Sequence, residues 1–239
     1  MALLWSLLFI DPLIILSTIF FGSISLVVSL FDTTGRTQIE VARVWSRSLL
    51  LFAGVRVTVE GISKINPDAS YVFASNHLSY MDTPVVLSHI PVQFRFLAKK
   101  GLFQIPFLGT HLARAGHIPV PRENPRAAVK TLTHAAEIIR ARGTSVLIFP
   151  EGGRSRDGEL HAFKEGAAYI AIKAHVPLVP ITVVGTRKVL AVGSATFRRA
   201  HVRLYIGDPI STKGLAVRDR ETLTASAREQ IAAMLEKYS

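Results

Sequence analysis

The chain has 239 residues, 49% of them hydrophobic, and its mean hydropathy of +0.34 is high for a water-soluble globular protein. Its 28 Lys and Arg residues outnumber 17 Asp and Glu residues, and the resulting net charge of +11 favours anionic partners such as nucleic acid, anionic lipid or phosphorylated substrates. The absence of cysteine excludes disulfides, thiol nucleophiles and cysteine-bound metals. The 8 histidines have no close metal-ligand spacing, so we expect no metal site.

The amino-terminal segment is strongly apolar, and Asp11 is its one charged residue between positions 2 and 31. Residues 13–31 carry no charge and would form a helix of about 28 Å, against roughly 30 Å of bilayer hydrocarbon. A cleaved signal peptide is disfavoured because no basic residue precedes the apolar run. The run is also long for a buried helix of a soluble core. We therefore expect residues 1–31 to anchor the chain in a membrane.

The way in which this anchor inserts stays open between one kinked span and a helical hairpin held in one leaflet. Asp11 and Pro12 predict that the helix breaks or restarts between the two apolar stretches. Small, weakly polar residues form a stripe at helical spacing: Thr18, Gly22, Ser25 and Ser29. Such a stripe lets another helix approach closely, and we expect the short first helix to be its partner.

Four arginines follow the apolar run: Arg36, Arg43, Arg47 and Arg56. If the run spans the bilayer, the positive-inside tendency places the rest of the chain in the cytoplasm. If it only dips into one leaflet, the same arginines meet anionic headgroups. We expect a location at the cell membrane, with residues 32–239 as a catalytic domain on the cytoplasmic side.

Residues 32–239 show short apolar strands alternating with helices. The expected strands are residues 55–60, 71–75, 93–98, 116–120, 145–149, 178–184 and 202–206. The expected helices are residues 37–53, 82–89, 105–114, 124–142, 165–174 and 218–238. Asp82 is expected to cap the second helix, and Gly143 to end the fourth. The alternation predicts an α/β fold with a largely parallel central sheet flanked by helices.

Three polar, loop-like stretches follow expected strands: residues 75–82, 119–122 and 149–158. The carboxyl ends of parallel strands meet at one edge of a sheet, and binding sites form there. If these strands are parallel, one histidine, two or three arginines and two acids gather at that edge.

His77 and Asp82 lie five positions apart, across a loop that enters a helix. A carboxylate bound to one imidazole nitrogen fixes the tautomer and leaves the other nitrogen free to act as a base. Because imidazole titrates near neutral pH, it suits removal of a proton from an alcohol. The alternative is that Asp82 only caps its helix and His77 is an ordinary loop residue.

The third stretch is rich in glycine and carries Arg154 and Arg156. Glycine allows the backbone to approach a ligand closely, and arginine binds phosphate in a bidentate way. Most Gly-Gly-Arg loops are only turns, and this one lacks the GxxxxGK[ST] pattern of a Walker loop.

Together these stretches resemble the lysophosphatidate acyltransferase (1-acyl-sn-glycerol-3-phosphate acyltransferase) family of glycerolipid acyltransferases, with the order and spacing of the motifs intact over about residues 70–185. Residues 76–82 match its NHxxxxD motif, and residues 149–155 resemble FPEGTRS. Further segments resemble other family stretches: residues 99–109, 116–122, 163–167 and 179–181. Three positions depart from the pattern: Gly153 replaces a threonine, and Pro119 and Pro121 stand where other residue types are usual.

The resemblance implies an enzyme that moves a fatty acyl group to the free sn-2 hydroxyl of 1-acylglycerol 3-phosphate, making phosphatidic acid in phospholipid biosynthesis. It implies that His77 is the general base and Asp82 its orienting partner. The implied substrate-binding residues are Lys100, Arg122 and Arg154 for the phosphate, and Glu151 and Gly152 for the glycerol. The implied partners are membrane lipids, lysophosphatidate, and acyl-CoA or acyl carrier protein (acyl-ACP) as co-substrate, with no bound cofactor.

Three other functions stay open. A related acyltransferase would accept glycerol 3-phosphate, another lysophospholipid or a lyso-aminolipid. A non-catalytic module would only bind anionic membranes. Nucleic-acid binding through the positive charge is disfavoured by the apolar amino terminus and by the lack of an aromatic–basic surface pattern, so we expect no nucleic-acid partner.

Overall fold

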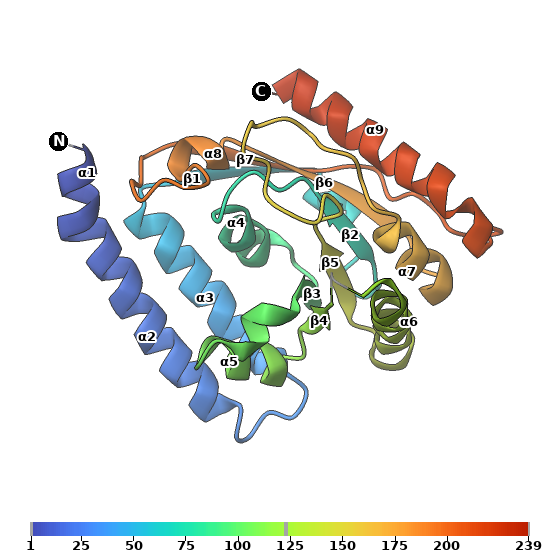
Figure 1. Cartoon of the computed structure of the whole chain (residues 1–239), viewed down its shortest axis with the longest axis horizontal. Helices are drawn as coiled ribbons and strands as arrows, with labels where there is room; N and C mark the ends of the chain where they lie inside the picture. The colour runs from blue at the N-terminus through green and yellow to red at the C-terminus, as the bar shows by residue number, and fades with distance from the viewer. Residues whose placement is uncertain (1, 122–123, 239) are drawn as a thin grey trace.

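The structure, a computed structural model, describes residues 2–121 and 124–238 (Figure 1). Within this part of the chain a seven-stranded sheet has the order β1-β7-β6-β2-β5-β3-β4. The strands are β1 (Arg56–Glu60), β2 (Val72–Ser75), β3 (Phe94–Lys99), β4 (Ile118–Val120), β5 (Ser145–Ile148), β6 (Leu178–Val184) and β7 (His201–Ile206). Neighbouring strands are parallel except β6 and β7, which are antiparallel. The expected α/β fold with a largely parallel sheet is therefore confirmed.

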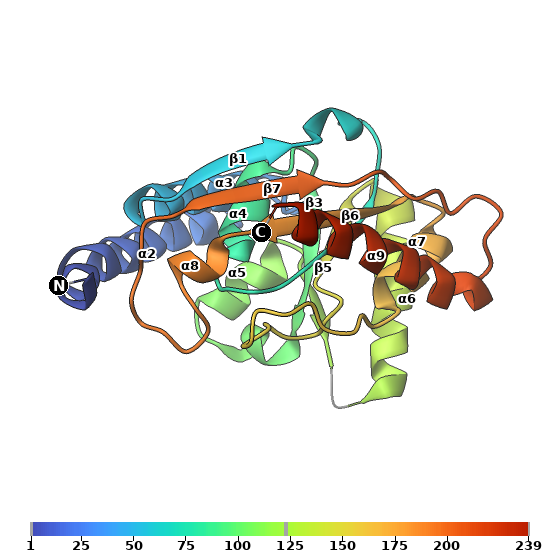
Figure 2. The same ribbon diagram turned by 90° about the horizontal axis from the view of Figure 1, so that it is seen from above.

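Helices cover both faces of this sheet (Figures 1 and 2). The α-helices are α1 (Ala2–Trp5), α2 (Asp11–Val28), α3 (Arg36–Phe52), α4 (Asp82–His89), α5 (Leu108–Arg114), α6 (Pro125–Arg142), α7 (Gly166–Ala174), α8 (Thr186–Val189) and α9 (Arg220–Tyr238). Shorter turns of other helix types are η1 (Ser6–Ile10), η2 (Ile62–Lys64), η3 (Lys100–Gln104) and η4 (Val217–Asp219). One core cluster lies between the sheet and α3 and α4, and a second lies beneath α6, α7 and α9.

Strand β2 illustrates why the inner strands of the sheet are mostly apolar. Phe73 belongs to the core cluster under α3 and α4, whereas Val72 and Ala74 belong to the cluster under α6 and α7. Successive side chains of a strand point to opposite faces, so a strand covered on both sides needs apolar residues at every position.

The amino-terminal segment is helical without interruption from Leu3 to Val28, so the expected break at Asp11 and Pro12 is wrong, whereas the alternative of a restart agrees with α2, which begins at Asp11. The helix continues through the wide π-helical turn η1, in which the N–H of Asp11 bonds the carbonyl of Ser6. Pro12 then lies in the first turn of α2, where its missing N–H is tolerated. The altered register of η1 explains how the helix passes a proline without ending.

The polar stripe of this helix packs against the rest of the protein. Trp45 of α3 donates to the hydroxyl of Thr18 (3.1 Å), and Ser25 is 2.7 Å from Nδ1 of His111 in α5. Arg114 donates to the hydroxyl of Ser29 (2.9 Å). The partners of the stripe are therefore α3 and α5, and our expectation that the short first helix covers it is wrong. Because the first turns of the segment continue directly into α2, they cannot fold back to pack against the stripe.

The opposite side of this helix is bare. Its exposed large apolar residues include Leu4, Leu8, Phe9, Ile15, Leu16, Ile19 and Phe20. Only 11% of its most apolar window is buried in the protein, although its length and composition are sufficient to cross a membrane. These features make the helix a candidate membrane anchor. The division into an anchor of residues 1–31 and a catalytic domain of residues 32–239 stays a prediction.

Candidate active site

The candidate site lies where strands β2, β5 and β3 end. These strands are adjacent and parallel, so the loops that follow them open at the same edge of the sheet. The loop after β2 carries His77, and the loop after β5 carries Glu151 and Arg154. Lys100 follows β3 directly, at the start of η3.

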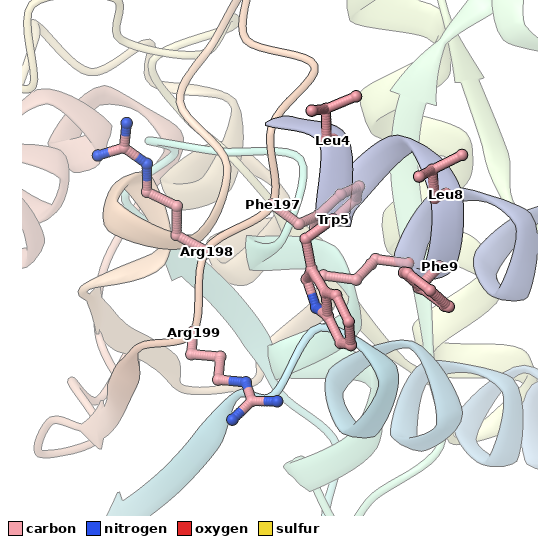
Figure 3. A pocket seen from close by; sticks show the side chains of 8 residues that line it. Leu4, Trp5, Leu8, Phe9, Phe197, Arg198 and Arg199 are labelled. Atoms are coloured by element: carbon pink, nitrogen blue, oxygen red, sulfur yellow. The ribbon is translucent and has the colours of Figure 1, made fainter. Parts of the chain in front are cut away.

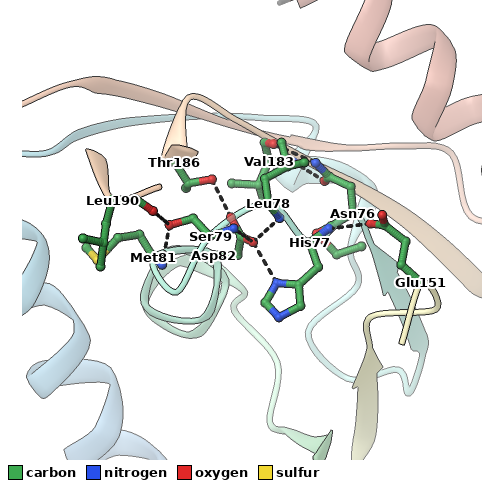
Figure 4. Close-up of polar contacts among 11 residues, drawn as sticks. Asn76, His77, Leu78, Ser79, Met81, Asp82, Glu151, Val183, Thr186 and Leu190 are labelled. Atoms are coloured by element: carbon green, nitrogen blue, oxygen red, sulfur yellow. Dashed lines mark hydrogen bonds and ion pairs between the residues drawn. The ribbon is translucent and has the colours of Figure 1, made fainter. Parts of the chain in front are cut away.

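Asp82 is fully buried and receives hydrogen bonds on both carboxylate oxygens (Figure 4). Its Oδ2 is 2.8 Å from Nδ1 of His77 and also accepts the backbone N–H groups of Leu78 (2.7 Å) and Ser79 (2.8 Å). Its Oδ1 accepts the hydroxyl of Thr186 at 2.5 Å. The carboxylate therefore favours the tautomer of His77 that carries its proton on Nδ1, which leaves Nε2 as a proton acceptor.

The expected role of Asp82 as a helix cap is wrong. Asp82 is the first residue of α4, and the capping position is occupied by Met81, which makes no side-chain capping bond. The carboxylate turns back toward the loop before the helix, because two N–H groups and an imidazole there supply its donors.

The ring of His77 is held by the loop after β5. It stacks on Phe149, with ring centroids 3.9 Å apart and planes inclined by 15°, and its side chain is 12% exposed. The backbone carbonyl of His77 accepts the N–H of Ser155 (2.8 Å). These contacts fix the imidazole at the sheet edge while leaving part of it accessible.

Glu151 joins two loops through its carboxylate. Oε1 accepts the backbone N–H of His77 (2.7 Å), and Oε2 accepts that of His161 (3.2 Å). Burial raises the pKa of Glu151 above its ordinary value. The neighbouring Gly152 has a positive φ of 76°, and a Cβ there would lie 3.1 Å from Nζ of Lys164. Glu151 thus supports the histidine loop, and the expected contact of Glu151 and Gly152 with glycerol stays a prediction.

Three cations were expected to bind phosphate. The guanidinium carbon of Arg154 lies 3.6 Å from the ring centroid of Tyr80, a cation–π contact. Nε of Arg154 is buried and has no hydrogen-bond partner among residues 2–121 and 124–238. Lys100 is exposed beside β3. Arg122 lies outside the described residues. An unpartnered buried donor on Arg154 is a feature that an anionic ligand would satisfy.

The sequence patterns did not reveal Thr186 or the role of Asn76. The amide of Asn76 donates to the carbonyl of Val183 (2.9 Å) and accepts its N–H (2.8 Å), which ties the histidine loop to β6. Asn76 belongs to the NHxxxxD pattern, so the sequence indicated that it has a role but not that Val183 is its partner. Thr186 lies 104 positions from Asp82, and no local spacing connects the two.

A family model described as acyltransferase matches residues 56–184. The chain is 37% identical over 172 residues to a chloroplastic 1-acyl-sn-glycerol-3-phosphate acyltransferase of Arabidopsis thaliana, covering 71% of this chain and 48% of that protein. It is 30% identical over 187 residues to a 1-acyl-sn-glycerol-3-phosphate acyltransferase of Borreliella burgdorferi, covering 78% and 74%. This chain spans about half the length of the plant relatives from Arabidopsis and Brassica napus.

Solved structures are also similar to this chain, and one of them matches almost all of it. It is the crystal structure of the 1-acyl-sn-glycerophosphate acyltransferase PlsC from Thermotoga maritima. The TM-score is 0.83 at 27% sequence identity, and the match covers 99% of this chain and 95% of that one. The similarity therefore includes the amino-terminal helix as well as the sheet.

Proposed function

Because this chain belongs to the acyltransferase family, we propose that it is a 1-acylglycerol-3-phosphate O-acyltransferase that makes phosphatidic acid. The observation that carries this proposal is the 2.8 Å contact between His77 and the buried Asp82, at the edge of a parallel sheet. The names of the relatives from Arabidopsis, Borreliella and Thermotoga support the choice of acceptor.

The reaction needs one proton acceptor and one electrophile. His77 accepts the proton of the free sn-2 hydroxyl on Nε2 while that oxygen attacks the thioester carbonyl carbon. The carbon–sulfur bond breaks, and the imidazolium returns the proton to the leaving thiolate. Asp82 stabilises the imidazolium through Nδ1–H, and general-base assistance of this kind contributes roughly 10²–10⁴ in rate. No metal or cofactor takes part in these steps.

Arg154, Lys100 and Arg122 are the residues that we propose to bind the substrate phosphate. The unpartnered Nε of Arg154 supports its part, because a phosphate oxygen would satisfy it. The stacking of its guanidinium on Tyr80 restricts its orientation before substrate arrives. The donor is an acyl thioester of coenzyme A or of acyl carrier protein, which present the same reacting carbonyl.

The contacts of the amino-terminal helix favour insertion into one leaflet over a span. The backbone N–H of Phe197 donates to Ser6 near one end of the helix (3.0 Å), and Ser25 contacts His111 near the other (2.7 Å). A helix attached along its length to a charged domain cannot cross the hydrocarbon without drawing that domain in. We propose that the helix lies in the cytoplasmic leaflet of the cell membrane, with the exposed arginines of the domain facing its anionic headgroups.

The location can be tested by single-cysteine labelling, because the natural chain has no cysteine. Ser194→Cys, in an exposed loop, should react with a membrane-impermeant maleimide only after the cells are opened. Leu16→Cys, on the bare face of α2, should stay protected until detergent dissolves the bilayer. Labelling of Ser194→Cys on intact cells would contradict the cytoplasmic assignment.

The reaction is tested with purified protein, a panel of lysolipids, and acyl-CoA or acyl-ACP, with products identified by mass spectrometry. We expect phosphatidate from lysophosphatidate, and a loss of at least about 10² in kcat for His77→Ala. His134→Ala is the matched control, because His134 is exposed on α6 and should be dispensable. Equal activity of His77→Ala and wild type would overturn the mechanism, and preference for another lysolipid would overturn the acceptor.

A further inference from the structure

An open groove of about 680 Å³ lies between the amino-terminal helix and the segment that follows α8 (Figure 3). Its lining residues are Leu4, Trp5, Leu8, Phe9, Ile10, Phe197, Arg198 and Arg199. The helix contributes only apolar and aromatic side chains. The opposite segment contributes Phe197 and two arginines, of which Arg199 extends toward Trp5 and Arg198 points away from it in Figure 3. The volume lies within the usual range for small-molecule sites, roughly 300–1,000 Å³.

The groove is a defined junction between the helix and the domain. The N–H of Phe197 donates to the hydroxyl of Ser6 (3.0 Å), which itself donates to Asp11 (3.2 Å). The stem of Arg199 packs against the backbone at Gly54, where a Cβ would lie 2.6 Å from Cγ of the arginine. The stem of Arg199 is thus held in position, and its guanidinium extends beside Trp5 in Figure 3.

The charges of the groove are free to bind an anion. Both Arg198 and Arg199 are exposed, and the ion pairs found among residues 2–121 and 124–238 include neither of them. Guanidinium groups bind phosphate in a bidentate way. Trp5 has an apolar body and a polar N–H, a combination that favours the boundary between acyl chains and headgroups.

We propose that this groove binds one anionic phospholipid, distinct from the lysolipid substrate. Its phosphate lies on Arg199, Arg198 adds positive charge on the same segment, and its acyl chains lie along Leu4, Leu8 and Phe9. A zwitterionic phospholipid is disfavoured, because its positively charged ammonium group cancels part of the attraction between its phosphate and the guanidinium groups. None of the groove residues belongs to the proposed catalytic set, so this site is separate from the reaction that we propose.

The groove is connected to the catalytic aspartate through one segment. The N–H of Arg198 bonds the carbonyl of Val189 (2.9 Å), and the neighbouring carbonyl of Leu190 accepts the hydroxyl of Ser79 (2.6 Å). The same segment begins at Thr186, which donates to Asp82. A lipid bound at the arginines would therefore stabilise the segment that holds the carboxylate, a consequence that rests on the proposed function.

The binding test uses the fluorescence of Trp5. The chain has 2 tryptophans, so Trp45→Phe leaves Trp5 as the single reporter, inside the groove. This variant is bound to phosphatidylcholine vesicles that contain either brominated phosphatidylglycerol or the same fraction of brominated phosphatidylcholine. We expect half-maximal quenching at a lower fraction of the brominated anionic lipid, by roughly fivefold for each arginine engaged. No substrate is present, so the result does not depend on acyl transfer.

Arg198→Ala and Arg199→Ala, singly and together in the Trp45→Phe background, should reduce this preference, with the larger effect at Arg199. Arg218→Ala is the matched control, because it removes the same charge from an exposed side chain on η4. Thermal unfolding verifies that each variant is folded. If the double variant does not fold, the comparison of the two single variants decides the result. Equal quenching by the two brominated lipids, or a preference that survives the loss of Arg199, would overturn the proposal.

Discussion

Asp82 illustrates at the residue scale how a buried charge is stabilised. Its side chain is inaccessible to solvent, so its carboxylate must obtain from the protein the hydrogen bonds that water would supply. His77 and two backbone N–H groups bind Oδ2, whereas Thr186 is the partner of Oδ1 within the described residues. Thr186 therefore orients the carboxylate that orients the imidazole.

Thr186→Val keeps the shape of the side chain and removes the hydroxyl. It leaves Oδ1 without a donor, and an unsatisfied buried acceptor costs about 1–3 kcal/mol. We expect kcat to fall roughly tenfold while KM for the lysolipid changes less than about twofold, because a rise of 1.4 kcal/mol in the barrier is tenfold in rate. Steady-state kinetics measure both. Thr186→Ser restores the hydroxyl, and a loss as large as that of Thr186→Val would show that the hydrogen bond is unimportant.

At the scale of elements, the connection between η3 and α5 depends on one glycine. The N–H of Gly109 bonds the carbonyl of Ile105 (2.7 Å), and a Cβ at Gly109 would lie only 2.1 Å from the carbonyl oxygen of Phe103. No side chain fits beside that backbone. This explains physically why the family-like stretch of residues 99–109 ends in glycine. The helical turn η3 in this stretch begins with Lys100 of the proposed phosphate site.

Gly109→Ala should lower the free energy of unfolding by about 1–3 kcal/mol, because the backbone must shift to admit the methyl group. Gly153→Ala is the matched control, since no atom lies within 4 Å of its Cβ position. We expect its effect to be within about 0.5 kcal/mol. Thermal and denaturant unfolding in detergent compare the two variants. Equal stability of both would mean that the turn relaxes without cost.

The whole molecule contains buried histidines that make its stability depend on pH. His117 is almost fully buried, its Nδ1 accepts the N–H of Phe96 (3.0 Å), and burial lowers its pKa to about 3 from 6.5. Burial also lowers the pKa of His111, which packs against the amino-terminal helix. In the unfolded chain these imidazoles bind protons more readily. Their contribution to stability is therefore present above pH 6.5 and is lost as the pH falls toward 3.

Between pH 7.5 and 5.5, one such histidine should reduce the free energy of unfolding by about 1.4 kcal/mol. His117→Asn keeps an acceptor for the N–H of Phe96 and removes the titrating group, so its stability should fall less over this range. Denaturant unfolding in detergent at the two pH values measures the difference. His134→Asn alters an exposed histidine and should behave as wild type. An identical pH slope for His117→Asn and wild type would contradict the assignment.

The sequence by itself determined most of the secondary structure and the parallel sheet. Short, mainly apolar strands separated by helices are typical of a sheet that is covered on both faces, and β2 contributes side chains to both core clusters. The sequence also determined which loops share an edge, because parallel strands end on one side. His77 and Asp82 could be paired in advance since they belong to one loop and the start of one helix.

The tertiary structure alone decided the contacts between distant parts of the chain. The pairing of Thr186 with Asp82 and the packing of Arg154 on Tyr80 join segments that no periodicity or spacing relates. The sequence allowed the Asp82 carboxylate either to cap α4 or to bind His77. The folded loop decided between the two, because it places the imidazole and two N–H groups on one side of the carboxylate. The π-helical turn at η1 carried the helix past Pro12, where local propensity predicted a break. The local pattern of apolar and polar residues predicts which faces of a helix or strand are buried. The partner of each buried polar group is determined only when distant segments pack together.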